Sequence, residues 1–152
     1  MRVSLKTGTA RRAISHQASA ALSVETLGRG QINLTAALIA WLREIEAGEG
    51  AVTLFCRHTS ASLTVQENAD PRVMADLADA LDRLAPETLS WRHDDEGPDD
   101  MPAHVKASLT SASLTIPVAA GRLQLGTWQA VYLLEHRRNP HRREVSLHYL
   151  GN

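Results

Sequence analysis

The segment AVTLFCRHTSASLTVQENADP, residues 51–71, decides the fold, because two strand patterns and a helix start follow one another in it. Residues 51–57 form a continuous apolar run, which is typical of a buried strand. Residues 62–66 alternate between apolar and polar side chains, as a half-buried strand does. Asp70 followed by Pro71 then predicts a helix with aspartate as its N-cap and proline in its first turn.

Outward from this segment, the sequence predicts an α+β fold with about seven strands in a twisted sheet or sandwich and two main helices. Apolar residues recur with the helical period in residues 34–47, behind a cap at Thr35, and again in residues 70–84. Residues 104–109 are ambiguous and fit a short helix. The remaining strands are expected at residues 13–26, 113–118, 123–125, 128–136 and 144–150.

The composition predicts one domain over residues 1–152 and excludes several functional classes. A hydrophobic content of 43% and a charged content of 22% are ordinary for a globular protein, and a net charge of -1 argues against nucleic-acid binding. The arginines between Arg137 and Arg143 fit a solvated rim and a phosphate-binding edge equally well. The single cysteine, Cys56, lies in an apolar run, which favours a buried, inert thiol.

No apolar run of the sequence is long enough for a membrane helix or for the core of a signal peptide. We therefore expect a cytoplasmic protein without a membrane partner.

Polar side chains gather directly after the buried strand and directly before the second helix. His58 follows the strand, where an imidazole can bind a metal or transfer protons near neutral pH, or be satisfied by hydrogen bonds at a strand end. Glu67 and Asn68 precede a helix N-terminus, which attracts anions, and neither has an evident structural role. The candidate residues of this region are His58, Thr59, Ser60, Glu67, Asn68 and Asp70.

The segment RHDDEGPDDMPAH, residues 92–104, is rich in acids and follows the second helix. Magnesium is often held by one or two carboxylates together with substrate phosphate oxygens, and Asp99 and Asp100 are candidates for this role. A solvated loop is the alternative interpretation. His104 and Lys106 follow directly, so the segment combines groups that bind metal with groups that bind phosphate.

The strand expected at residues 128–136 carries the last group of candidates. Trp128 can stack on a heteroaromatic ring or belong to the core. His136 is a third imidazole beside His58 and His104, and three histidines with an open position suit a catalytic zinc ion. The candidates of this strand and its end are Trp128, Gln129, Glu135, His136 and Arg137.

Three motifs together resemble the signature segments of the YjbQ-like family, which is described as a family of secondary thiamine-phosphate synthases. They are HTSASLTVQENADP at residues 58–71, EGPDDMPAH at residues 96–104 and GRLQLGTWQAVYLLEHR at residues 121–137. The resemblance runs from about Gln31 to Leu150. It implies an α+β sandwich that assembles as a homotrimer around a threefold axis.

The resemblance also implies an activity, the joining of hydroxymethylpyrimidine diphosphate to thiazole phosphate with release of diphosphate. Carried onto this chain, it assigns chemical roles to His58, Glu67, Asp99, His104 and Glu135. The residues expected to bind the phosphorylated substrates are Thr59, Ser60, Asn68, Asp70, Asp100, Lys106, Trp128, Gln129 and Arg137.

A divalent metal is expected, either magnesium with the diphosphate substrate or zinc at His58, His104 and His136, and no organic cofactor is expected. Two other functions fit the same donors. One is a metal-assisted enzyme that acts on another phosphorylated metabolite. The other is a non-enzymatic trimer that binds a metal or a small ligand.

Overall fold

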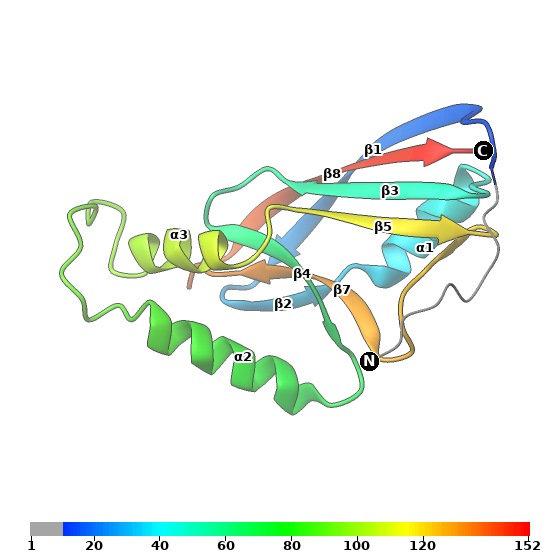
Figure 1. Ribbon diagram of the computed structural model, residues 1–152. Coiled ribbons are helices and arrows are strands. Elements are labelled where there is room, and N and C mark those ends of the chain that lie inside the picture. The colour runs from blue at the N-terminus through cyan, green and yellow to red at the C-terminus, as the bar shows by residue number, and fades with distance from the viewer. Residues whose placement is uncertain (1–10) are drawn as a thin grey trace.

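A larger and a smaller antiparallel β-sheet face each other across the hydrophobic core in the computed structural model, which describes residues 11–152 (Figure 1). Three helices accompany the sheets. The elements in chain order are β1 (His16–Thr26), β2 (Gly30–Asn33), α1 (Thr35–Glu44), β3 (Gly50–Cys56), β4 (Ala61–Glu67), α2 (Pro71–Leu84), α3 (Asp100–Leu109), β5 (Ser113–Ala119), β6 (Arg122–Leu123), β7 (Gln129–Glu135) and β8 (His141–Gly151).

The larger sheet has the strand order β1-β8-β3-β5-β6, and the apolar run expected to form a buried strand is its central strand β3. Val52 and Leu54 of β3 point into the core and are fully buried. They pair across the sheet with Tyr149 and Leu147 of β8, which are also buried. Alternation along each strand therefore gives the sheet one apolar face and one outer face.

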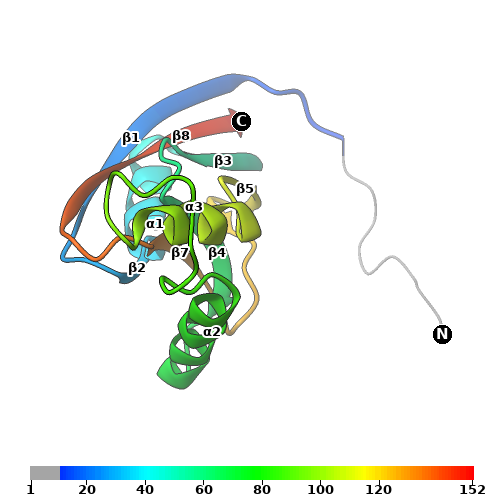
Figure 2. The ribbon, with the colours of Figure 1, turned by 90° about the vertical axis from the view of Figure 1, so that its left-hand side faces the viewer.

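The smaller sheet has the order β2-β7-β4, and its inward face supplies the opposite wall of the core. Leu63 of β4 pairs with Leu133 of β7, and both are fully buried. Helix α1 adds Leu38 and Leu42 to the same cluster. Helix α2 lies on the other side of the smaller sheet, away from the larger one, as Figure 1 and Figure 2 both show.

Helix α2 begins as the sequence predicts, since the Asp70 side chain accepts a hydrogen bond of 2.9 Å from the Arg72 backbone N–H. It covers the sheet only loosely. Met74 is its one buried residue, while Leu77 on the same side remains 37% exposed. This incomplete packing leaves a cavity between the helix and the sheet.

The predicted α+β class is confirmed, and several details differ. The ambiguous segment at residues 104–109 is the second half of α3, so residues 11–152 contain three helices, and β2, which the sequence did not predict, brings their strands to eight. The predicted cap at Thr35 is wrong: Leu34 is the N-cap, and the Thr35 hydroxyl instead accepts a hydrogen bond from Val131 N–H. No helix within residues 11–152 has the length and hydropathy to cross a bilayer.

Candidate functional site

Three segments that are distant in sequence meet at the end of the smaller sheet where β7 finishes. They are the turn after β3, the loop that leads into α3, and the residues that follow β7. His104 on α3 contacts the Thr59 carbonyl in the turn, and Arg137 after β7 contacts Asp99 and Asp100 at the start of α3. The candidate residues of the turn after β3 therefore lie close to those at the start of α3 and to Arg137.

The centre of this region is a group formed by His93, Asp100 and His104, here called the histidine cluster. Asp100 Oδ2 lies 2.9 Å from His93 Nε2 and 3.4 Å from His104 Nε2. One ligand atom of each residue falls within 4.8 Å of the others. Asp100 is buried, whereas the two imidazoles are partly open to solvent, so a bound species can enter from the histidine side.

The hydrogen bonds around His104 determine which of its nitrogens faces the carboxylate. Its Nδ1 lies 3.1 Å from the Thr59 carbonyl oxygen, which can only accept, so Nδ1 carries the proton. In the neutral ring, Nε2 then presents a lone pair toward Asp100 Oδ2. Two lone pairs that face each other repel, and either a proton or a cation between them relieves the repulsion.

Asp100 Oδ2 is buried and has no hydrogen-bond partner among residues 11–152. The other oxygen, Oδ1, is held by Arg137, and Asp99 Oδ2 accepts a hydrogen bond of 3.2 Å from the same guanidinium. The arginine thus fixes the carboxylate from behind and leaves Oδ2 free, which is the usual arrangement behind a ligating carboxylate.

The donor set fits a divalent metal ion of the transition series better than magnesium. Zinc ligands lie about 2.0–2.2 Å from the ion, which places neighbouring ligand atoms about 3–3.6 Å apart, close to the two distances between Asp100 and the histidines. Two imidazole nitrogens and one carboxylate oxygen suit zinc and its neighbours, whereas magnesium prefers oxygen ligands.

Asp99 holds the loop before α3 in place. Although burial opposes ionisation, the Arg138 backbone N–H and the Arg137 charge lower the pKa of Asp99. Asp99 Oδ2 accepts a hydrogen bond of 2.8 Å from the Arg138 N–H. Its carboxylate is therefore occupied by the chain itself and orients the segment that carries Asp100.

The expected zinc site of His58, His104 and His136 is not formed within residues 11–152. The Nε2 atom of His58 accepts a hydrogen bond of 2.7 Å from Glu144 N–H, and burial lowers the pKa of this imidazole. His136 is buried, and its Nε2 lies 2.8 Å from the Ser62 hydroxyl. Burial, with a further contribution from the Lys106 charge, lowers the pKa of His136 to about 4. Each ring is thus engaged elsewhere in the fold.

Glu135, expected to act in the chemistry, is part of a closed ion pair in the core. It is 1% exposed and accepts hydrogen bonds of 2.7 Å and 2.6 Å from the Arg143 guanidinium. Thr26 and the Arg137 N–H complete its shell. Burial raises the pKa of Glu135, but these hydrogen bonds outweigh burial and leave it below its usual value. Such a carboxylate has no free lone pair directed at a substrate.

Lys106 points away from the acidic loop. Its side chain is 2% exposed, and its ammonium pairs with Asp82 of α2. It therefore joins α3 to α2. The neighbouring turn is tied down as well, because the Ser60 hydroxyl accepts a hydrogen bond of 3.1 Å from Arg143.

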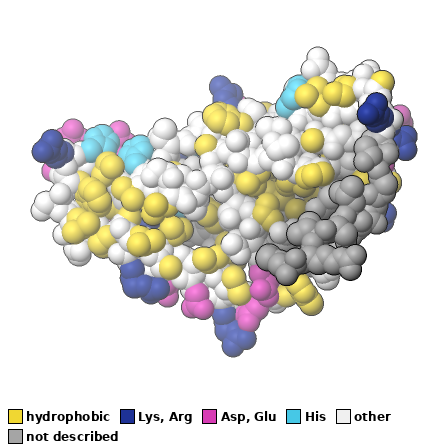
Figure 3. Space-filling view, viewed as in Figure 1, with side chains coloured by type: hydrophobic (Ala, Val, Ile, Leu, Met, Phe, Trp, Pro, Cys, Tyr) yellow, Lys and Arg dark blue, Asp and Glu magenta, His cyan; other side chains and the backbone are white. Residues whose placement is uncertain are grey.

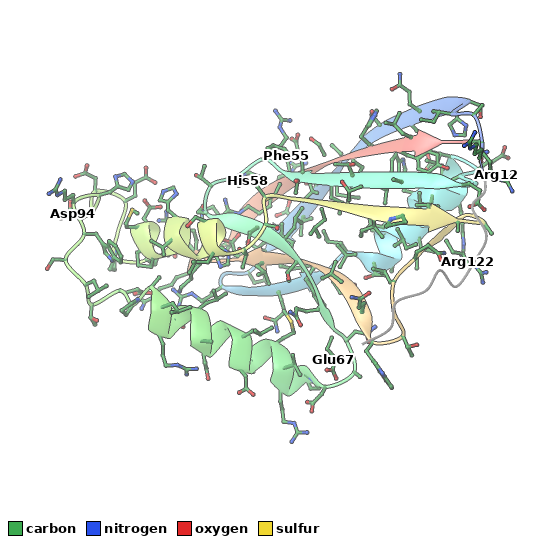
Figure 4. The ribbon with its side chains drawn as sticks, viewed as in Figure 1. Arg12, Phe55, His58, Glu67, Asp94 and Arg122 are labelled. Carbon is green, nitrogen blue, oxygen red and sulfur yellow. The ribbon has the colours of Figure 1, made fainter. Side chains whose placement is uncertain are left out.

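The other candidates lie at the opposite end of the smaller sheet. In Figure 4, His58 lies in the turn that leads into β4, and Glu67 lies at the other end of that strand. The seven residues of β4 span roughly 20 Å at about 3.3 Å per residue, so one small molecule cannot contact both ends within one chain. The residues at the far end are Glu67, Asn68, Asp70, Trp128 and Gln129.

Of these far-end residues, Asp70 and Gln129 have structural roles, and Asn68 and Trp128 are exposed. Asp70 caps α2, and Arg72 lowers the pKa of its carboxyl through side-chain and backbone hydrogen bonds. The Gln129 side chain accepts a hydrogen bond of 2.8 Å from Gly126 N–H. Trp128 is 64% exposed, so it does not belong to the core.

His93 is the residue of the cluster that the sequence reasoning misses. It lies in a loop without periodicity, and only its position in the same short segment as Asp100 and His104 points to it. Asp100 and His104 are four residues apart on α3, which places them on one helix face. Figure 3 shows histidine side chains beside acidic ones at this end of the molecule, with hydrophobic side chains gathered next to them.

Comparison with known proteins gives matches across most of the chain. A family model described as UPF0047 protein YjbQ-like matches residues 20–152. UPF0047 protein sll1880 of Synechocystis sp. is 48% identical over 131 residues, which cover 86% of this chain and 89% of that protein. Protein TT1486 of Thermus thermophilus superposes with a TM-score of 0.75 at 40% identity, over 84% of this chain and 97% of that one. A YjbQ/UPF0047 protein of Clostridium acetobutylicum gives a TM-score of 0.78 at 35% identity, with the same two coverages.

Proposed function

Because the chain belongs to the UPF0047 YjbQ-like family, we propose that it is a secondary thiamine-phosphate synthase with a metal bound at the histidine cluster. The enzyme joins hydroxymethylpyrimidine diphosphate to thiazole phosphate and releases diphosphate. The observation that carries the proposal is Asp100 Oδ2, which has no hydrogen-bond partner among residues 11–152 and faces two imidazole nitrogens beside the partly buried Arg137.

The reaction requires charge stabilisation more than proton transfer. The thiazole ring nitrogen attacks the methylene carbon of the pyrimidine, a carbon–nitrogen bond forms, and the bond from that carbon to the diphosphate oxygen breaks. The electron pair leaves with the diphosphate, and no proton has to be removed. This chemistry does not require a free general base. The arrangement in which the Glu135 carboxylate is fully hydrogen-bonded by Arg143 is therefore compatible with it.

The chain's own residues would bind and orient the leaving group. When bound, a divalent cation supplies positive charge to the diphosphate oxygens. His93 and His104 would hold such an ion through their Nε2 atoms, and the Thr59 carbonyl keeps the His104 proton on Nδ1. Arg137 holds Asp100 in position and adds positive charge behind the carboxylate.

The proposal is tested by diphosphate release with both precursors, with each precursor alone, and with zinc, manganese or magnesium added. Asp100→Asn is expected to lower turnover at least tenfold. Asp94→Asn, which changes an exposed acid of the same loop, should leave turnover unchanged. Release that does not depend on both precursors, or wild-type turnover in Asp100→Asn, would show that the proposal is wrong.

We propose a homotrimer as the assembly. Support comes from the outer face of the larger sheet, where Phe55 of β3 is 50% exposed and Leu150 of β8 is 42% exposed. Both alternate with core residues and so lie on the face that points away from the core. Light scattering should give three times the chain mass, and Phe55→Glu should reduce it; a monomeric wild type would refute the assignment.

A further inference from the structure

On the outer face of the smaller sheet, β4 carries polar side chains under helix α2, whereas Ala130, Tyr132 and Leu134 of β7 form an apolar cluster with Met74 of the helix. On β4, Ser62, Thr64 and Gln66 alternate with Leu63 and Val65, which pack in the core. A helix normally meets an apolar sheet face, because both sides then bury hydrophobic surface. Polar side chains beneath a helix need partners of their own.

The loose packing of α2 leaves a cavity of about 260 Å³ above this polar face, here called the α2 pocket. Its sheet side includes Gln31, Thr64 and Gln66. Its helix side includes Leu77 and Ala78. The pocket therefore combines apolar surface, from the helix and from Leu134 of β7, with hydroxyl and amide groups of the sheet.

The charged groups around the α2 pocket neutralise one another. Lys106 pairs with Asp82, and Arg29 lies 3.3 Å from Asp82 Oδ2 and 2.6 Å from Glu87 Oε1. Glu135 is paired with Arg143. A pocket whose charges are already matched favours an uncharged guest over an anion or a cation.

We propose that the α2 pocket binds the uncharged aminopyrimidine ring of the substrate, an inference that rests on the proposed function. An aminopyrimidine places an amino donor beside a ring-nitrogen acceptor, a pattern that a carboxamide such as Gln66 can match with its own acceptor and donor. The faces of the ring are apolar and suit the leucine side of the pocket.

The α2 pocket and the histidine cluster share two chain segments. His136 lines the pocket, and the next residue, Arg137, contacts Asp100. On α3, Lys106 lines the pocket, and His104, two residues earlier, belongs to the cluster. The pocket and the cluster are thus linked through residues that are at most two positions apart in the chain.

The experiment measures binding of hydroxymethylpyrimidine without phosphate to the full chain by isothermal titration calorimetry, with metal omitted. Ala78→Phe places a bulky ring in the pocket from an exposed helix position, and Ala75→Phe makes the same change at an exposed α2 position outside it. We expect saturable binding, a loss of at least about tenfold in Ala78→Phe, and no loss in Ala75→Phe. Thr64→Val, which preserves shape, should weaken binding about fivefold.

The outcomes separate this inference from the proposed function. Pocket-dependent binding of the ring without any synthase turnover would support the pocket and refute the synthase. Turnover with the same KM in Ala78→Phe and the wild type would keep the synthase and overturn the pocket. The pocket would also be overturned if the wild type did not bind the ring, or if Ala78→Phe, Ala75→Phe and the wild type bound it equally well.

Discussion

Replacement of Glu135 by glutamine should destabilise the fold strongly, because it leaves the Arg143 guanidinium buried without a counter-charge. The two side chains are 0% and 6% exposed and form a bidentate pair, with Thr26 and the Arg137 N–H as further donors to the carboxylate. Breaking a buried pair from one side costs about 3–5 kcal/mol. For a chain of this size, that corresponds to a fall in Tm of about 6–20 °C.

Urea unfolding of the wild type and Glu135→Gln at pH 7 gives the difference in the free energy of unfolding. Arg142→Met is the matched control, because this neighbouring arginine is 74% exposed and should leave the midpoint nearly unchanged. Changing both Glu135 and Arg143 to methionine should recover much of the loss.

The pH dependence provides a second readout of the same pair. The folded pKa of Glu135 is depressed, so its stabilisation is fully present above the unfolded value of about 4.3 and is lost as pH falls through the folded pKa. Glu135→Gln should remove this part of the acid dependence. A variant with wild-type stability and abolished turnover would refute the structural role and restore the catalytic one.

Three further outcomes are expected. His93→Ala should lose bound zinc or manganese in elemental analysis of the purified protein, while His58→Ala should retain it; equal metal content in both would contradict the histidine cluster. Because the pKa of His136 is lowered to about 4, the unfolded state binds more protons between that value and about 6.5. Stability by urea unfolding should therefore fall as pH decreases through this window, and His136→Gln should flatten the profile; an unchanged slope would disprove the assignment. Leu38→Ala, at a fully buried position of α1, should lower the free energy of unfolding by about 2–5 kcal/mol by the same assay, whereas a loss below about 1 kcal/mol would mean that the site collapses around the smaller side chain.

Most of the fold is predictable from the sequence because its elements carry strong periodic patterns. The apolar run around Val52 becomes β3, and the Asp70-Pro71 start becomes the first turn of α2. The exceptions are strand β2, which has only four residues, and the first half of helix α3. Helix α3 buries the charged residues Asp100 and Lys106, so its sequence lacks the helical period of apolar residues by which a helix is recognised.

The sequence predicts which types of residue form the candidate site, but it does not predict which side chains contact one another. Asp100 and His104 are recognisable from their segment, yet His93 belongs to an irregular loop, and only the folded chain brings it to Asp100. The opposite error concerns Glu135. Its residue type suggests chemistry, but its partner Arg143 lies on the next strand, and no local pattern reports that pairing.

Strand β8 follows every other strand of the larger sheet in the chain, yet it lies between β1 and β3 in space. Thr26 of β1 and His141 of β8 are paired although they are 115 residues apart in the sequence. The pairing of β1 with β8 is therefore a long-range contact, and its formation costs chain entropy. During synthesis, β1 and β3 wait with unpaired edges until β8 is made. The order of strands therefore makes the closure of the larger sheet a late event in folding.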